Sequence, residues 1–282
     1  MLFNQQLIKG YIKQKNTIRH LYRITIKLLE YAYVSSYVGC THIILLTNPI
    51  INIQEKKTNI CIIVSAIIST SIVTFGSVNM YTIHQTTYNL KTEKSITPTK
   101  ICFISDVHYP NANNPQRLKE ITNTLMKVKT DFYLLGGDFV DESTSKEDME
   151  ILFKQLRRLT KVAPVYFVYG NHESKTKFTR NKLNQKITKN NITILNDQEV
   201  HFNNITLIGR KDYTNKNRKK TKDYNLSTKT YNIILDYQPQ GTRENIKNNI
   251  DLQLSGHTHN GQIFPLSYSY HLQPDFAVIT EK

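Results

Sequence analysis

The sequence contains little cysteine, and its cysteines are not arranged for a structural role. Among 282 residues there are three, Cys40, Cys61 and Cys102. Their number is odd and their spacing fits neither a zinc site nor a disulfide framework, so we expect buried free thiols. The sequence also lacks an internal repeat, a zinc finger, an RNA-binding aromatic signature and a recognition helix. These absences disfavour a protein that binds nucleic acid.

Acidic residues are few relative to basic ones, with 22 Asp and Glu against 37 Lys and Arg and a formal net charge of +15. A basic surface favours anionic partners, which include phosphorylated substrates, acidic lipid headgroups and nucleic acid. A basic run, Lys216–Lys220, lies within a polar loop at Lys211–Thr228. We expect this run to be a solvated face, as such runs usually are. Contact with a lipid headgroup or a nucleotide is the alternative.

Charged residues are absent from two long stretches near the N-terminus, Tyr31–Gln54 and Thr58–Leu90. Within the second stretch, the apolar segment Ile60–Val78 matches the roughly 20 residues that a bilayer-spanning helix needs. It predicts a membrane span, and a buried helix or strand pair of a soluble fold is the alternative. Tyr31–Gln54 is a second candidate span, but it is more polar and contains Pro49. A cleavable signal peptide is disfavoured, because the basic region before the apolar segment is too long.

After Leu90, short apolar runs alternate with segments of helical periodicity. Helices are predicted around Leu118–Val128 and Met149–Leu156. A capping box at Thr144 and Glu147, or at Ser145 and Asp148, can begin the second helix. The predicted strands are Lys100–Ile104, Phe132–Leu135, Pro164–Val168, Ile192–Leu195, Ile205–Ile208, Tyr231–Leu235 and Leu252–Leu254. This alternation predicts a layered α/β domain.

Polar clusters of one kind follow four of these strands: Ser105–His108, Gly136–Asp141, Tyr169–Glu173 and Ser255–Gln262. Active sites of α/β sheets lie beyond the carboxyl ends of the strands, so these clusters are expected at one edge. Carboxylates, an amide oxygen and imidazoles suit first-row metal ions, and one carboxylate can bridge two ions. The glycines in the clusters allow sharp turns and a close backbone approach.

The four clusters resemble the signature of the calcineurin-like metallophosphoesterase family: Asp-x-His, Gly-Asp-x-x-Asp, Gly-Asn-His-Glu and Gly-His-x-His. They match in order and spacing, with 32 residues from Asp106 to Asp138 and 33 from Asp138 to Asn171. The resemblance covers roughly residues 96–265. The run Leu254–Gln262 is similar to the bacterial membrane-associated branch. The resemblance implies a layered α/β/β/α sandwich over residues 96–282, preceded by an N-terminal transmembrane region within residues 1–95.

The resemblance also implies residue roles and a reaction. It implies two divalent or mixed-valence first-row ions (Mn, Fe or Zn) and hydrolysis of phosphomono- or phosphodiesters by a metal-bound hydroxide. The first ion would be held by Asp106, His108 and His259, and Asp138 would bridge both ions. The second ion would be held by Asn171 and His257. His172 would face the phosphate and assist the leaving group, and Asp141 would orient the site through hydrogen bonds.

The sequence departs from the family pattern at Tyr237, in the run Leu235–Pro239, where the resemblance implies a histidine ligand. A phenolate can bind a hard ferric-type ion, so Tyr237 stays a candidate ligand, but with a free pKa near 10 it suits most ions less than imidazole does. The second ion should be weakened or its identity changed. The tail Leu266–Lys282 is also shorter than in relatives. The alternative function is therefore an impaired membrane-bound relic that binds metal or phosphate without efficient turnover.

Partners and location follow from the same features. We expect a phosphorylated small-molecule or lipid-linked substrate and a bacterial cell-membrane location. A nuclease is a third, disfavoured option. Six basic residues within residues 1–30 favour a cytoplasmic N-terminus. A single span at Ile60–Val78 then places the catalytic domain on the outer side, whereas a hairpin with Tyr31–Gln54 would return it to the cytoplasm.

Overall fold

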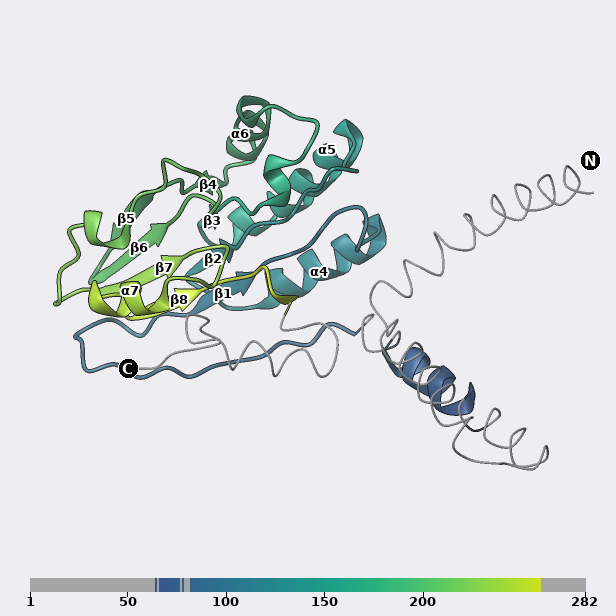
Figure 1. Ribbon diagram of the computed structural model, residues 1–282, viewed down its shortest axis with the longest axis horizontal. Helices are drawn as coiled ribbons and strands as arrows, with labels where there is room; N and C mark the ends of the chain where they lie inside the picture. The colour runs from purple at the N-terminus through teal and green to yellow at the C-terminus, as the bar shows by residue number, and fades with distance from the viewer. Residues whose placement is uncertain (1–63, 65, 77, 79–81, 260–282) are drawn as a thin grey trace, which may run out of the picture. The chain divides into compact units, whose positions relative to one another are not determined.

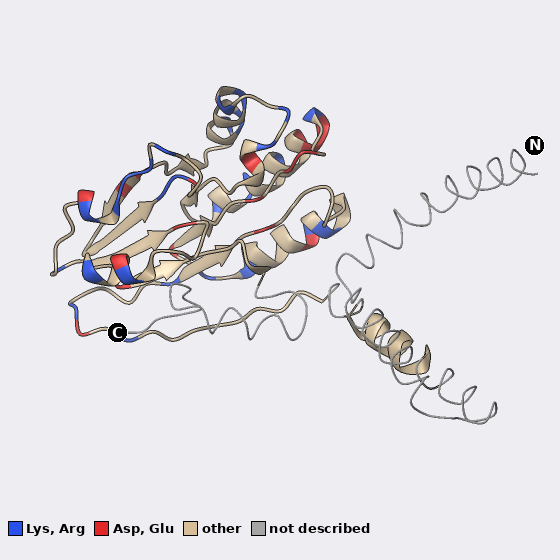
Figure 2. Ribbon diagram, in the orientation of Figure 1, with Lys and Arg blue, Asp and Glu red and all other residues tan. Residues whose placement is uncertain are grey.

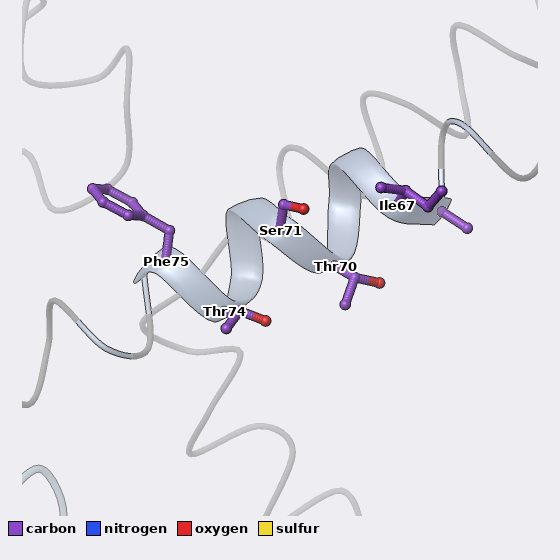
Figure 3. Close-up of a pocket in the computed structure, with 6 residues that line it drawn as sticks. Ile67, Thr70, Ser71, Thr74 and Phe75 are labelled. Carbon is purple, nitrogen blue, oxygen red and sulfur yellow. The ribbon is translucent and has the colours of Figure 1, made fainter.

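The computed structural model describes residues 64, 66–76, 78 and 82–259. They fall in two compact units that divide after Thr86, and each unit is described by itself. In the first unit, residues 66–76 form a helix. An open hollow on this helix has no ionisable side chain among the residues that line it (Figure 3): Ala66, Ile67, Thr70, Ser71, Thr74 and Phe75.

Both candidate membrane spans involve residues outside this description. Tyr31–Gln54 lies wholly outside it, as do residues 60–63, 65 and 77 of the segment Ile60–Val78. Among the residues that are described, no helix has the length and apolar character needed to cross a bilayer. The predicted C-terminal tail, Leu266–Lys282, also lies outside the described residues.

Two four-stranded sheets form the centre of the second unit (Figure 1). The first sheet is parallel throughout, in the order β1 (Ile101–Ile104), β2 (Phe132–Leu135), β3 (Val165–Phe167) and β4 (Thr193–Ile194). The second sheet has the order β5 (Gln198–Phe202), β6 (Ile205–Gly209), β7 (Tyr231–Leu235) and β8 (Leu252–Leu254). Its strand β5 is antiparallel to β6, and β6, β7 and β8 are parallel.

Helices connect most of the parallel strands, and the three longest helices of this unit begin at side-chain caps. The helices of the second unit are α4 (Pro115–Lys127), α5 (Lys146–Leu156), α6 (Arg180–Lys189) and α7 (Thr242–Lys247), with short 3₁₀ turns η1 (Leu159–Lys161), η2 (His172–Ser174) and η3 (Thr221–Asp223). Helix α5 begins with the capping box of Ser145 and Asp148. Thr144, the other predicted cap, instead accepts a hydrogen bond from the Asp141 amide and donates one to the Tyr109 carbonyl.

The alternation of side chains along β2 decides the layering. Tyr133 and Leu135 pack in the core that includes residues of α4, α5 and α6. Phe132 and Leu134 point the other way and pack against residues of β6, β7 and β8. On the far side of the second sheet, Ile234 packs with residues outside the sheet, Tyr224 and Ile250. Since strand side chains alternate between faces, helices cover one face of the first sheet and the second sheet packs on its other face, which confirms a layered α/β domain with two sheets.

The sequence predicted the buried strands well and the exposed elements poorly. Strands β2, β7 and β8 have their predicted bounds, and the other four predicted strands differ by one residue at one or both ends. Strand β5 and helices α6 and α7 were not predicted. No residue of β5 is fully buried, so it lacks the apolar pattern that marks a strand. Cys102 is a free thiol, as expected, and is only partly buried.

Charged residues lie on helices and loops, and the strands are almost free of them (Figure 2). The basic run Lys216–Lys220 is exposed, as predicted, except at Arg218. The Arg218 side chain is 8% exposed and donates hydrogen bonds to the fully buried Asp236 carboxylate and to the Lys211 carbonyl. Arg210 lies 3.4 Å from the same carboxylate. This ion-pair network fastens the loop to the segment that follows β7.

Candidate metal centre

The predicted site residues come from the carboxyl ends of strands in both sheets. Asp106 and His108 follow β1, Asp138 follows β2, and Asn171 and His172 follow β3 in the first sheet. Tyr237 follows β7, and His257 and His259 follow β8, in the second sheet. Because parallel strands end at one edge, the two sheets deliver these side chains to a common place.

Two carboxylates and three imidazoles lie close enough to hold metal ions. The ligand atoms of Asp106, His108 and His259 lie within 4.8 Å of one another, and so do those of His108, Asp138 and His172. The Nε2 atom of His259 is 3.5 Å from Asp106 Oδ1, and that of His108 is 3.7 Å from Asp138 Oδ2. His108 belongs to both groups, so the groups share one centre.

Left-handed backbone conformations are concentrated at this centre. Positive φ angles are uncommon for residues other than glycine, and they mark strained, functional positions. Five of the residues with positive φ are candidate ligands: Asp106 (57°), His108 (45°), Asp138 (53°), His257 (71°) and His259 (48°).

Two glycines leave room for the carboxylates. A Cβ atom on Gly170 would lie 2.2 Å from Asp138 Oδ1, and one on Gly256 would lie 2.4 Å from Asp106 Oδ2. Either atom would overlap a candidate ligand. The glycines that the sequence analysis singled out therefore serve a close approach of chain to carboxylate.

Asn171 shows that the site fits a cation. Its Oδ1 atom is buried and has no hydrogen-bond partner in the described part of the chain. A buried amide oxygen without a partner is costly, and a hard cation would satisfy it. The combination of carboxylate, amide and imidazole donors suits first-row metal ions. Asp106, His108, His259, Asp138 and Asn171 therefore fit the role of ion ligands.

Tyr237 lies between the two carboxylates. Its hydroxyl oxygen lies 3.0 Å from Asp106 Oδ1 and closer to Asp138 Oδ2, so its single proton can be donated to either carboxylate. Burial first, and then the charges of Asp106 and Asp138, raise the pKa of Tyr237 far above its usual value. The hydroxyl is thus placed as a hydrogen-bond donor to the carboxylates.

His257 is exposed, as is His259, whereas Asp106, His108, Asp138 and Asn171 are not. Its backbone amide donates to both oxygens of Asp106 at 3.1 Å. Its ring packs edge-on against Tyr237 with 5.1 Å between centroids. His257 is not a member of either ion-sized group among the described residues.

His172 is oriented by a residue that the sequence analysis did not single out. Its Nδ1 atom lies 3.1 Å from the Glu142 carboxylate, while its Nε2 atom lies 4.0 Å from Asp138 Oδ2. The neighbouring Asp141 points elsewhere, and its carboxylate accepts hydrogen bonds from Asn111 and Ser143. Asp141 thus fixes the loops after β1 and β2, and Glu142 contacts the histidine.

Glu173 is the second residue that sequence reasoning left without a role. It is buried, and its carboxylate accepts hydrogen bonds from the amides of Asp138, Phe139, Val140 and Gly170. Through these hydrogen bonds Glu173 links the turn after β2 to the turn after β3, next to the metal centre. Burial, and next the charge of Asp138, raise the pKa of Glu173 to about 8, against these amide bonds. The sequence feature that could have pointed to a role for Glu173 is its position in the Gly-Asn-His-Glu run.

Burial also controls the charge of the ligands themselves. It lowers the pKa of His108, against the opposing charge of Asp138. A neutral imidazole is the form that binds metal. Burial raises the pKa of Asp138, against the Tyr237 hydrogen bond. A bound cation would favour the ionised carboxylate.

The family profile described as calcineurin-like phosphoesterase matches residues 99–261. The chain belongs to this family. The match covers the four motif clusters up to Gly261 and the two sheets that carry them. It confirms the family predicted from the motifs and identifies the centre described above as that of a metallophosphoesterase domain.

Similar curated proteins carry the same family name. A Helicobacter pylori protein called an uncharacterized metallophosphoesterase is 33% identical over 177 residues, which cover 60% of this chain and 46% of the relative. An Aquifex aeolicus protein of the same description is 28% identical over 208 residues, covering 69% and 77%. A bovine transmembrane protein with metallophosphoesterase domain is 28% identical over 203 residues, covering 65% and 45%. The match thus spans about half the length of the Helicobacter and bovine relatives.

Proposed function

We propose that this chain hydrolyses phosphomonoesters or phosphodiesters with metal ions bound at the shared edge of its two sheets. The observation that carries the proposal is the convergence of the Asp106 and Asp138 carboxylates with the imidazoles of His108, His172 and His259. Family membership supports metal-dependent cleavage of a phosphoric ester. Bound ions would neutralise the phosphoryl oxygens and activate water for attack on phosphorus.

The candidate ligands form two groups according to their positions in the centre. Asp106, His108 and His259 form the group best placed for one ion, and Asp138 lies beside it. Asn171, with its unpartnered amide oxygen, and the exposed His257 are the candidates for a second.

His172 is the proposed proton donor to the leaving group. Its Nδ1 atom faces Glu142, so its Nε2 atom is directed toward the centre. Glu142 would hold the ring in that orientation by accepting the Nδ1 proton in a hydrogen bond, and donation to the leaving group would use the doubly protonated ring, whose second proton lies on Nε2. Proton transfer by a positioned histidine contributes about 10² to 10⁴-fold to rate.

Hydrolysis of aryl phosphates tests the proposal directly. The purified chain, loaded with Mn²⁺, Fe, Zn²⁺ or Co²⁺, is assayed with an aryl phosphomonoester and an aryl phosphodiester. We expect hydrolysis that is lost in His108→Ala and kept in His201→Ala, which changes an exposed histidine on β5. Failure of every metal and both substrates would refute the proposal. Turnover that survives in His108→Ala would show that the site lies elsewhere.

Membrane attachment is a further part of the proposal. The charge-free segment Ile60–Val78 supports it, as does the word transmembrane in the bovine relative's name. A lipid-linked or other phosphorylated small molecule is the proposed substrate, with the catalytic domain on the outer side. Protease added to intact bacterial spheroplasts should then digest residues 96–282. Protection of that region until lysis would overturn the single-span topology.

The impaired relic remains a second candidate because Tyr237 contacts both carboxylates. A relic would bind metal and show turnover in no condition, whereas an enzyme would show turnover that depends on the ions. Replacement by Tyr237→His provides the comparison. A large gain in rate would show that the present chain is impaired.

A further inference from the structure

Tyr237 reaches the metal centre from the opposite sheet to the carboxylates that it contacts. It follows β7 of the second sheet, while Asp106 and Asp138 follow β1 and β2 of the first. The residue is 1% exposed. Asp236 and Gln238, on either side of it, are buried and bonded to Arg218 and Asp212. The phenol is therefore held in place by its neighbours on both sides.

The hydroxyl of Tyr237 contacts the carboxylate oxygen atoms that lie nearest the imidazoles. It lies within hydrogen-bond distance of Asp106 Oδ1, the oxygen nearest His259, and of Asp138 Oδ2, the oxygen nearest His108, and can donate its proton to either. An ion held between these carboxylates and imidazoles must bind those oxygens. A hydroxyl proton and a metal ion thus have overlapping positions.

Other hydrogen bonds occupy more of the Asp106 carboxylate than of the Asp138 carboxylate. Asp106 also accepts hydrogen bonds from the Ser105 hydroxyl and the His257 amide, and Asp138 accepts one from the His172 amide. A carboxylate has about four acceptor positions. The hydrogen bond of Tyr237 therefore removes a position that an ion would use.

We propose that Tyr237 is a competitor of the metal ions rather than one of their ligands, and that it weakens their binding to Asp106 and Asp138. The inference rests on the proposed function, because it concerns the same centre. It gives opposite predictions to a ligand role. Removing a competing donor must tighten metal binding, whereas removing a ligand must loosen it.

The experiment measures Mn²⁺ affinity by calorimetry in the full chain and two variants. Tyr237→Phe removes the hydroxyl and keeps the ring. Tyr213→Phe is the matched control, because Tyr213 is 59% exposed. We expect Tyr237→Phe to bind Mn²⁺ about tenfold more tightly, since a hydrogen bond to a charged group contributes about that factor. The control should equal the wild type. Unchanged or weaker binding in Tyr237→Phe overturns the inference.

A measurement on the unmodified chain guards against misfolding of the variant. Loading with Fe³⁺ should give no visible tyrosinate-to-iron charge-transfer absorption, because a competitor that contacts the carboxylates would not coordinate the ion. Appearance of such a band overturns the inference, since the oxygen would then be a ligand. Both readouts are independent of turnover. Tighter Mn²⁺ binding without hydrolysis would refute the proposed function and leave this inference standing, and no Mn²⁺ binding in any variant would refute both.

Discussion

Replacing Gly170 by alanine tests how closely the chain must approach Asp138. The new Cβ atom would lie 2.2 Å from Asp138 Oδ1 and 2.7 Å from the Asp138 amide nitrogen. Carbon and oxygen normally approach to about 3.3 Å, so one of the two must move by roughly 1 Å. Asp138 has no room to retreat without changing its bonds to His172 and Tyr237, because it is 1% exposed.

The expected losses follow from that displacement. Overpacking a filled interior costs about 1–3 kcal/mol of unfolding free energy. A 1 Å misplacement of a catalytic group lowers the rate by about 100-fold. We therefore expect Gly170→Ala to lose about two decades in kcat/KM for an aryl phosphate and to bind Mn²⁺ more weakly.

The matched control is Gly241→Ala, the same substitution at the N-cap of α7. A Cβ atom there meets nothing within 4 Å, but the φ of 83° strains any residue other than glycine. The control should lose about 1–2 kcal/mol of stability through that strain and keep wild-type metal affinity. Urea unfolding followed by circular dichroism measures stability, since the chain has no tryptophan. If Gly170→Ala kept activity within threefold and bound Mn²⁺ normally, the close approach would have no functional meaning.

Three further outcomes are expected. Asp236→Asn should lower the free energy of urea unfolding by about 3–5 kcal/mol, because it leaves the buried guanidinium groups of Arg210 and Arg218 without their counter-charge; a loss under 1 kcal/mol would contradict this. Glu142→Gln should lower kcat about tenfold with little change in KM, since Glu142 orients His172. An unchanged kcat would show that His172 does not depend on Glu142 for its orientation. Chelation of bound ions should lower the melting temperature, and re-addition of metal should restore it, with a stabilisation that rises with the logarithm of the metal concentration. Equal melting temperatures with and without metal would argue against a stabilising ion.

Several features of the site could be predicted because they depend on local sequence. The runs that end at Ile104, Leu135 and Leu254 are short and apolar, so they read as buried strands. A side chain just after a parallel strand must lie at the carboxyl edge, whatever the details of packing. The positions of Asp106 and Asp138 at that edge follow from this rule.

Other features depend on contacts between residues far apart in the chain. Tyr237 meets Asp138 across 99 residues and Asp106 across 131. These contacts exist only because the two sheets pack face to face through Phe132, Leu134 and their partners. Nothing in the run around Tyr237 indicates which carboxylate its hydroxyl meets.

The sequence by itself determined the family, the strands of the buried core and the set of residues at their ends. The tertiary structure decided what those residues touch. In the structure Glu142, and not Asp141, contacts His172. Arg218 forms an ion pair with the buried Asp236, and Glu173 accepts hydrogen bonds from four backbone amides. The physical reason is that periodicity and turn chemistry act over a few residues, whereas hydrogen bonds at this centre join segments brought together only by the packing of the two sheets.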